Sequence, residues 1–423
     1  MLRNADTSSR RHVWIVNHYA GPPRRGGGTR HHDLAQQLYL RGYAVTIFAS
    51  SISHFGGAAE AIPRMRLYRT EMVESIRYVW IRGPAYGGNS ARRFLNMISF
   101  AVLAVLVQAR FGRPNAVIGS TVHPLAAAAG YLMARLRRAK FFFEVRDLWP
   151  QTLIDMGALR EGSAQARALR RIESFLMTHG DGVISLLPGM DAYLRERALH
   201  PGPLLYLPNG VDLSRPVVSL GPQPQLPECL AAWRAANAWI CVYLGAHGRA
   251  NNLSTALEAA RILQKGPDSR VRLLLVGDGP EKAALVERAA ELGLKNVSFA
   301  DPVAKRHVPV LLAAVDAGLV QVLRTPIYRY GMSFNKLFDY MANRKPVVFA
   351  CETASDPVAE HRAGFTVLPE DPEALAAALR RMSELPQDEL DAMGRRGLDY
   401  VRAHHDTAVL GSRLADYLEA GRG

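Results

Sequence analysis

The feature that most constrains the fold is an alternation of short apolar runs with glycine-containing loops and helical patterns, which recurs along nearly the whole chain. Residues 12–17, HVWIVN, form the first run, a loop containing Gly26, Gly27 and Gly28 and then a helical pattern follow, and residues 44–49 form the next run. Strand, loop, helix and strand in this order build doubly wound parallel sheets. The sequence therefore predicts an α/β fold.

The alternation starts again in the second half, where residues 239–245, WICVYLG, and 271–280, VRLLLVGDGP, are expected strands with a helix between them. A proline-rich segment at 219–228 precedes this restart and is typical of a linker. A chain of 423 residues can form two domains with separate cores. We predict a tail at 1–10, a first domain at 11–210, a linker at 211–235, a second domain at 236–405, and a last helix at 406–420 that packs back on the first domain.

The composition indicates a globular protein, with 48% hydrophobic and 21% charged residues. The first ten residues lack the apolar core of a secretory signal, and no apolar run reaches the roughly 18 residues that cross a bilayer. Residues 97–107 are therefore expected to be a buried helix, with an interfacial membrane helix as the alternative. The three cysteines, Cys229, Cys241 and Cys351, lack disulfide or metal-ligand spacing. We expect a cytoplasmic protein.

The net charge of +14 lies entirely in the first half of the chain. Residues 1–200 contain 27 Lys and Arg against 13 Asp and Glu, whereas the remainder contains 25 of each kind. This polarity predicts an anionic partner for the first half, such as a membrane surface, a lipid diphosphate or a nucleic acid. Nucleic acid is the least favoured of the three, because the arginines are scattered and no nucleic-acid motif is present.

Residues 330–350, YGMSFNKLFDYMANRKPVVFA, combine a turn, a helix, a second turn and a strand. Gly331 gives the first turn its flexibility, and Ser333 is expected to cap the helix. The strand is the β-branched and aromatic run that follows Pro346. The expected apolar face of the helix consists of Leu337, Phe338, Tyr340 and Met341.

The first turn of this helix has the features of a phosphate site. Unpaired N–H groups and the helix dipole attract anions to a helix N-terminus, and Lys336 adds a full positive charge there. Asp339, one turn later, can accept hydrogen bonds from sugar hydroxyls. The alternative from the residues alone is an amphipathic helix with an exposed Lys and Asp.

The segment NKLFDYMANRKPVV resembles the donor-binding segment of GT-B glycosyltransferases of family 4, especially the branch that builds bacterial O-antigen and capsule and includes N-acetylfucosaminyltransferases. The motifs GGGTRH, PNGVD and GDGP occur in the family's order along nearly the whole chain. The resemblance implies the GT-B fold, in which two Rossmann-like doubly wound domains face a cleft.

The resemblance also implies a set of donor-binding residues. A glycine loop lies beside the donor diphosphate, an Arg pairs with it, a backbone group reads the base, and an acidic residue holds the ribose. The family's Lys shortly after that Arg is replaced here by Asn251 or Asn252, and Lys336 is expected to supply the second charge. Mapped onto this chain, the donor residues are Gly27, Gly28, Gly245, Arg249, Gly277, Asp278, Val303, Ser333, Asn335, Lys336 and Asp339.

In the first domain, polar residues follow two expected strands. His123 comes after the strand at 116–121, and Glu144, Arg146 and Asp147 lie at the end of KFFFEV and in the turn after it. From the residues alone, a local Arg146–Asp147 or Glu144–Arg146 ion pair is the structural alternative to a catalytic role. The resemblance implies that all four residues are catalytic or pocket residues, with Arg146 where many relatives carry His.

The chain departs from the family at one acidic position. Many members carry two Glu residues separated by seven, and Asp339 matches the second, but Gly331 stands eight residues before it. Sugar contacts are therefore expected from Ser333, Asn335 and backbone amides of the 331–335 turn.

The expected function is retaining transfer of a sugar, an N-acetylhexosamine or its 6-deoxy form, from UDP to a lipid-linked acceptor on polyprenyl diphosphate. No obligatory metal is expected, because no DxD-type carboxylate pair lies near the phosphate site. A nucleotide-sugar epimerase or hydrolase on the same scaffold is the alternative, with Glu144, Asp147 and His123 moving protons.

The basic first half is expected to hold the enzyme peripherally on the inner face of the cytoplasmic membrane. The basic clusters at 92–93 and 135–140 are the expected contact.

Overall fold

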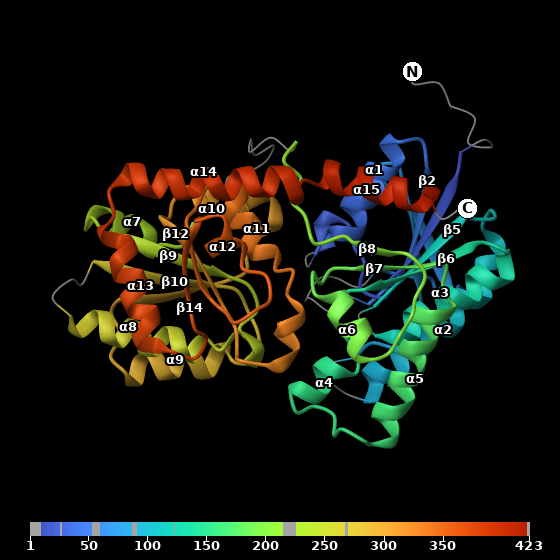
Figure 1. The fold of residues 1–423 in the computed structure, drawn as a ribbon, viewed down its shortest axis with the longest axis horizontal. Helices are drawn as coiled ribbons and strands as arrows, with labels where there is room; N and C mark the ends of the chain where they lie inside the picture. The colour runs from blue at the N-terminus through green and yellow to red at the C-terminus, as the bar shows by residue number, and fades with distance from the viewer. Residues whose placement is uncertain are drawn as a thin grey trace. The chain divides into compact units, whose positions relative to one another are not determined.

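The computed structural model describes residues 10–25, 28–52, 60–86, 91–121, 123–214, 226–266 and 270–420. The described chain divides into two units (Figure 1), which are treated separately below. Unit 1 comprises residues 1–208 and 407–423, and unit 2 comprises residues 209–406. The expected tail lies outside the described residues except for Arg10, and so do residues 215–225 of the expected linker. The last residues of that linker form a helix in unit 2.

Unit 1 is built on an eight-stranded sheet of order β3-β4-β2-β1-β5-β6-β7-β8. All neighbours are parallel except β3 and β4, which pair in antiparallel fashion. The predicted α/β class is confirmed for this unit. The strands are β1 (His12–Val16), β2 (Ala44–Ser50), β3 (Tyr68–Val73), β4 (Ile76–Ile81), β5 (Ala116–Ser120), β6 (Lys140–Val145), β7 (Gly182–Ser185) and β8 (Leu204–Tyr206).

The central strands of unit 1 are continuous apolar runs because helices cover both faces of the sheet. The final helix, α15, belongs to this unit: Leu410, Leu414 and Leu418 join the core formed by β1, β2 and β4. Arg41 of α1 donates to the carbonyl of Ala408 at 2.9 Å. The helices are α1 (Arg30–Leu40), α2 (Ala91–Val107), α3 (Pro124–Arg137), α4 (Gln151–Asp155), α5 (Ala164–His179), α6 (Met190–Glu196) and α15 (Thr407–Ala420), with 3-10 turns at Pro23–Arg25 and Gln108–Arg110.

Unit 2 repeats the plan with a six-stranded parallel sheet of order β11-β10-β9-β12-β13-β14. Two apolar clusters, one on each face, pack the helices against this sheet. The strands are β9 (Trp239–Leu244), β10 (Val271–Val276), β11 (Val297–Ala300), β12 (Ala317–Gln321), β13 (Val347–Ala350) and β14 (Gly364–Val367). The helices are α7 (Cys229–Ala235), α8 (Leu253–Lys265), α9 (Lys282–Glu291), α10 (Val308–Ala313), α11 (Asn335–Ala342), α12 (Pro357–Glu360), α13 (Pro372–Glu384) and α14 (Gln387–His404), with 3-10 turns at Arg249–Asn251, Lys305–His307 and Pro326–Tyr330.

Helix α2 corrects one expectation from the sequence. The helical stretch Arg92–Arg110 is the one described helix that is long and apolar enough, by length and composition, to cross a membrane, although the apolar run alone is shorter. Only 33% of the most apolar part of that stretch is buried, so it is not the buried helix that was expected at 97–107. One face packs on the unit and the other is exposed. The three cysteines are free thiols.

Candidate functional site

In unit 2, two glycine-containing loops meet at the carboxyl edge of the sheet. Gly245 follows β9 with φ +148°, and Gly277 and Gly279 follow β10 with φ +153° and +158°. A Cβ on Gly277 would collide with the carbonyl oxygen of Gly245, and one on Gly279 with that of His247. Asp278 is exposed, and its backbone oxygen accepts from the His247 amide at 2.8 Å. The GDGP glycines therefore let the two loops pack against each other.

Lys336 brings a positive charge to this edge of the sheet. Its Nζ donates to the hydroxyl of Tyr243 at 2.8 Å and to Oδ1 of Asn251 at 3.2 Å, and lies 3.9 Å from the centre of the Tyr243 ring. A Cβ on Gly245 would lie 3.0 Å from the same nitrogen. Within the described chain Lys336 has no ion pair, and loss of surrounding water lowers its pKa to about 7. The alternative in which Lys336 is an exposed residue of the helix is wrong, because the residue is half-buried.

Lys336 lies beside the loop after β9, where the lysine that is usual in the family is missing. Asn251 stands in that loop, and the Lys336 ammonium lies against its side-chain oxygen. Arg249, at the start of the 3-10 turn, is exposed. Two positive charges from different segments thus reach the Gly245 loop, one fixed among neutral groups and one in solvent.

Helix α11 begins at Asn335, and its N-cap position is occupied by Phe334 rather than by the expected Ser333. Ser333 instead binds Asn209. Its Oγ accepts from the backbone N–H of Asn209 at 2.7 Å, and its carbonyl accepts from the Asn209 side chain at 2.6 Å. The Pro208-Asn209-Gly210 turn therefore anchors the approach to α11. Asn335 itself is exposed at the helix start.

The predicted apolar face of α11 is confirmed, since Leu337, Phe338, Tyr340 and Met341 are all buried. Tyr340 also performs a role that the sequence did not predict. Its hydroxyl accepts from the amide of Leu244 at 2.8 Å and donates to the carbonyl of Leu319 at 3.2 Å, which ties α11 to β9 and β12. Its ring also fills the space that a side chain at Gly318 would need. A glycine inside a mostly apolar strand was the available signal for this contact.

Asp339 lies on the polar side of α11 but is only 8% exposed. Both carboxylate oxygens accept from Nζ of Lys305, with the longer bond at 2.6 Å. Lys305 begins the 3-10 turn after the loop that contains the half-buried Val303. The sequence placed Asp339 as an outward acceptor for sugar hydroxyls and did not anticipate this cation, which orients the carboxylate.

In unit 1, the corresponding edge of the sheet carries a buried ion network. Glu144, at 2% exposed, pairs with Arg30 Nη2 at 2.9 Å and accepts from His31 Nε2 at 2.6 Å. Arg30 also donates to the carbonyl of Leu207 at 2.7 Å. Burial works against the charge, but Arg30 and His31 hold the pKa of Glu144 well below its usual range. Both oxygens of Glu144 are therefore engaged by α1.

The charged residues at the end of β6 and just after it do not form the direct ion pairs of the structural alternative, although, against the raising effect of desolvation, the Arg146 charge lowers the pKa of both Glu144 and Asp147. Among the described residues, neither Asp147 nor Glu144 forms an ion pair with Arg146. The Arg146 amide donates to Thr121 Oγ1 at 2.8 Å, its guanidinium is half-buried, and the buried Nε lacks a partner in the described chain. Asp147 is exposed at the same edge. Arg146 and Asp147 are thus the groups from this stretch that remain available to a ligand.

His123 follows β5 and caps α3, because its Nδ1 accepts from the amide of Ala126 at 3.4 Å. Its ring lies 4.8 Å from that of His18, which follows β1. Burial lowers the pKa of His123 to about 3, so the ring is neutral, and its buried Nε2 has no partner within the described residues. Because its ring contacts that of His123, His18 joins the residues expected at this site, although the sequence did not point to it. Gly28 is exposed before α1, and Gly27 lies outside the described residues.

Two family models match the chain. A glycosyl transferase 4-like domain matches residues 25–210, and the glycosyl transferases group 1 domain matches residues 239–384. Together these models cover more than half of the chain, and their boundaries fall within units 1 and 2 respectively, apart from the last two residues of the first match.

Curated relatives and solved structures agree with these models. WbjE of Pseudomonas aeruginosa, named a probable glycosyltransferase, is 23% identical over 70% of this chain and 72% of its own. WcaI of Escherichia coli strain K12, named for glycosyl transfer in colanic acid biosynthesis, is 26% identical over 76% of this chain and 80% of its own.

Among solved structures, sucrose-phosphate synthase from Thermosynechococcus elongatus has a TM-score of 0.75 at 18% identity, covering 97% of this chain and 99% of its own. HepE of Anabaena, in complex with UDP and glucose, has a TM-score of 0.67 at 15% identity, covering 97% of this chain and all of its own. The chain is therefore a GT-B glycosyltransferase with a glycosyl transferase 4-like domain followed by a glycosyl transferases group 1 domain.

Proposed function

We propose that the protein is a retaining glycosyltransferase that moves a sugar from a UDP-sugar to a lipid-linked saccharide during synthesis of a bacterial surface polysaccharide. The observation that carries this proposal is the Lys336 ammonium. It is held by neutral partners beside the glycine loop after β9, and it has no carboxylate partner in the described chain. A donor diphosphate is the anion that fits this position.

The donor diphosphate would lie over the Gly245 loop, where Lys336 and the exposed Arg249 flank it. Charge that develops on the leaving diphosphate would be stabilised by these two cations and by the N-terminus of α11, which begins at the exposed Asn335. Asp339 would accept hydrogen bonds from the ribose, with Lys305 fixing its orientation, and Val303 would lie near the base.

Comparison with known proteins supports the substrate classes. HepE binds UDP-glucose in a solved complex, which favours a UDP-sugar as donor. WcaI is named for colanic acid biosynthesis, which favours a surface polysaccharide as the product. The sugar is proposed to be an N-acetylhexosamine or its 6-deoxy form, and the acceptor a saccharide on polyprenyl diphosphate.

The acceptor would bind at the carboxyl edge of the unit 1 sheet. His123, whose buried Nε2 has no partner among the described residues, can donate to or accept from an acceptor hydroxyl, and the Arg146 guanidinium can donate to one. The exposed carboxylate of Asp147 can take the proton of a hydroxyl that attacks the donor sugar. The excess positive charge of unit 1 suits the diphosphate of such an acceptor and the anionic inner face of the cytoplasmic membrane.

The proposed function is tested by incubating the purified protein with a panel of radiolabelled UDP-sugars, with and without a polyprenyl-diphosphate-linked saccharide. Transfer of label to the lipid only when both substrates are present supports the proposal, and the anomeric proton coupling of the product tests retention. UDP-sugar turnover that does not need the acceptor would instead favour an epimerase or hydrolase. A parallel reaction in EDTA tests the expectation that no metal is obligatory.

A further inference from the structure

Helix α2 exposes large apolar side chains along one face. Their exposed fractions run from 38% to 59%, and their spacing of three or four residues puts them on the same side of the helix. The opposite side is buried in unit 1. The exposed residues are Phe94, Leu95, Ile98, Val102 and Leu106, and the buried ones include Asn96, Phe100, Ala104 and Val107.

The apolar surface continues onto α3, which packs beside α2. Leu132 and Leu136, one helical turn apart, are 47% and 57% exposed on α3, and Phe175 is 42% exposed on the neighbouring α5. Between α3 and α5 lies an apolar groove of about 360 Å³, whose lining is contributed by Ala128, Tyr131, Arg171, Ile172, Phe175 and Leu176. We call the exposed residues of α2 and α3, together with this groove, the apolar face.

Positive charges flank the part of the apolar face that belongs to α2 and α3, and the sequence of this part carries no negative ones. Residues 75–143 contain ten Lys and Arg and no Asp or Glu. Arg92 is exposed at the start of α2, and Arg110 and Arg113 are exposed just beyond its end. Arg135 is exposed on the last turn of α3. The cations therefore stand at both ends of α2 and along α3.

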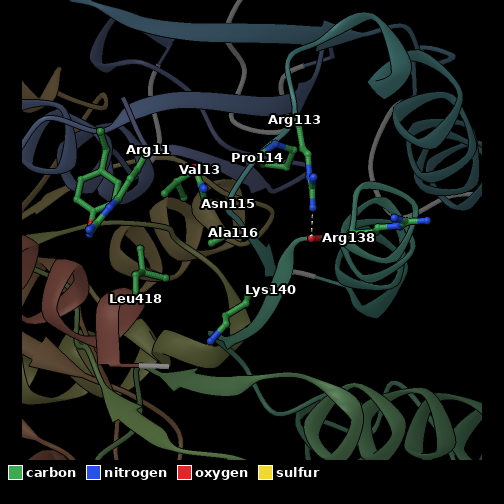
Figure 2. A pocket seen from close by; sticks show the side chains of 10 residues that line it. Arg11, Val13, Arg113, Pro114, Asn115, Ala116, Arg138, Lys140 and Leu418 are labelled. Carbon is green, nitrogen blue, oxygen red and sulfur yellow. Dashed lines mark hydrogen bonds between the residues drawn. The ribbon is translucent and has the colours of Figure 1, made fainter. Parts of the chain in front are cut away.

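The carboxyl ends of α2 and α3 adjoin a basic pocket (Figure 2). Arg137 of α3 donates to the carbonyl of Gln108 at 2.7 Å, which joins the two helix ends. Arg113 reaches the backbone carbonyl of Arg138 at 3.1 Å, as Figure 2 shows. The pocket, of about 460 Å³, is lined by Arg11, Arg113, Arg138 and Lys140 among others, and the acidic Glu419 pairs with Arg11.

We propose that the apolar face rests on an anionic lipid bilayer, with α2 lying in the plane of the interface and its exposed side chains inserted among the lipids. This proposal deepens the proposed function by naming the surface through which the enzyme meets its lipid-linked acceptor. An apolar stripe bordered by arginines is the pattern of a helix that binds an interface, and anionic headgroups would meet the flanking cations.

Two observations select this occupant over the alternatives. A second copy of the chain would bring one set of arginines against another, with no acidic residue in the same stretch to compensate. A membrane-spanning α2 would have to leave its place in unit 1, where Asn96 Nδ2 donates to the carbonyl of Pro84 at 2.7 Å and Phe100 is fully buried. Binding in the interface plane keeps both contacts.

The buried side of α2 connects the apolar face to the acceptor edge of unit 1. The ring of Phe100 lies 4.7 Å from that of His18, and Arg93 Nε donates to the Tyr19 hydroxyl at 3.0 Å. His18 in turn faces His123. A helix that touches lipid on one side and these residues on the other would bring the diphosphate of a membrane-held acceptor close to the proposed site.

The first test measures binding of the full-length protein to vesicles by co-sedimentation. We expect binding to equimolar phosphatidylglycerol and phosphatidylcholine, release as salt rises, and little binding to pure phosphatidylcholine. The double variant V102Q/L106Q should weaken binding at least tenfold, and R92Q/R110Q about tenfold or more at low salt. All four residues are exposed or at a helix end, so the melting temperature should be unchanged.

Matched controls come from exposed residues of unit 2. Val286 and Leu368 are 44% and 54% exposed, and Lys265 and Lys295 are exposed cations. The variant V286Q/L368Q makes the same kind of apolar-to-polar change, K265Q/K295Q removes the same charge as R92Q/R110Q, and both should bind vesicles like the parent. Wild-type binding by V102Q/L106Q would overturn the proposal. So would conversion of a dimer to a monomer by the same variant with no change in vesicle binding, which would assign the face to a second copy.

A second test measures insertion directly. Tryptophan introduced as L106W should lose fluorescence on vesicles with brominated acyl chains, whereas L368W should not, each compared with the parent protein. Absence of quenching in L106W while the protein is vesicle-bound would contradict insertion. Neither test uses sugar transfer, so failure of the proposed function leaves vesicle binding intact. The variant V102Q/L106Q, in turn, should transfer sugar to a short-chain, water-soluble acceptor at the parent's rate, because that acceptor does not need the membrane.

Discussion

Each unit places a charged side chain at the carboxyl edge of its sheet, but the two side chains differ in their partners. In unit 1, Glu144 is buried and both of its oxygens are occupied by Arg30 and His31. In unit 2, Lys336 is half-buried and has only neutral partners, Tyr243 and Asn251, among the described residues. A buried charge with charged partners holds the fold together, whereas a desolvated charge among neutral groups remains available for a ligand of opposite sign.

The largest effect is expected on stability from Glu144→Gln. The substitution leaves Arg30 buried without its carboxylate, so the free energy of unfolding should fall by about 3 kcal/mol or more, measured by urea denaturation. Glu173 is the matched control, because it is equally buried but is hydrogen-bonded by the Tyr193 hydroxyl at 2.8 Å, and burial raises its pKa to about 7. Glu173→Gln at pH 6 should cost much less. If both variants lost the same free energy of unfolding, the ion pairs of Glu144 would not stabilise the fold more than the hydrogen bond of Glu173 does.

The second largest effect is expected on catalysis, from the substitution Lys336→Ala. Turnover at saturating donor should fall by about one to three orders of magnitude, the scale of losing one charge-stabilising donor. Unfolding free energy should change little, because the variant removes a desolvated charge that has no ion pair in the described chain. Lys336→Arg keeps the charge and should restore part of the rate. A wild-type rate in Lys336→Ala would exclude this residue from the mechanism and with it the contrast between the units.

The pH dependence of UDP binding sharpens the same contrast. Lys336 has a pKa of about 7 in the ligand-free protein, so it is charged below pH 7 and loses its proton as pH rises. Since a diphosphate needs the charged form, UDP affinity should fall by up to about tenfold per pH unit between pH 7.5 and 9.5. Calorimetry should also detect proton uptake on binding. In Lys336→Arg, whose guanidinium stays charged, the slope should disappear; a slope that persists there would belong to another group.

The smallest effect is expected from Asp339→Asn. The carboxylate is already engaged by Lys305, so losing its charge should weaken UDP binding only about three- to tenfold. The decisive measurement is discrimination between UDP and its 2′-deoxy and 3′-deoxy analogues, which should shrink in the variant if Asp339 contacts the ribose. A purely structural partner of Lys305 would weaken all three ligands equally, and that result would withdraw the ribose assignment.

Much of the fold followed from local patterns. The apolar face of α11, the continuous strands and the glycine loops were all predicted, because burial imposes a periodicity that a short window of sequence displays. The turn that ends α11 before the strand was also predicted. Its start was displaced, because Ser333 is bound by Asn209, a residue 124 positions away.

What the sequence determined by itself is the architecture and the presence of a lysine in the first turn of a donor-domain helix, since both depend on residues close together in the chain. Only tertiary structure decided that Glu144 pairs with Arg30, 114 positions away, that Lys336 is desolvated against Tyr243, and that α2 shows one apolar side to solvent. The physical reason is that the energy of a charge or an apolar face depends on its neighbours in space, which hydrophobic periodicity does not encode.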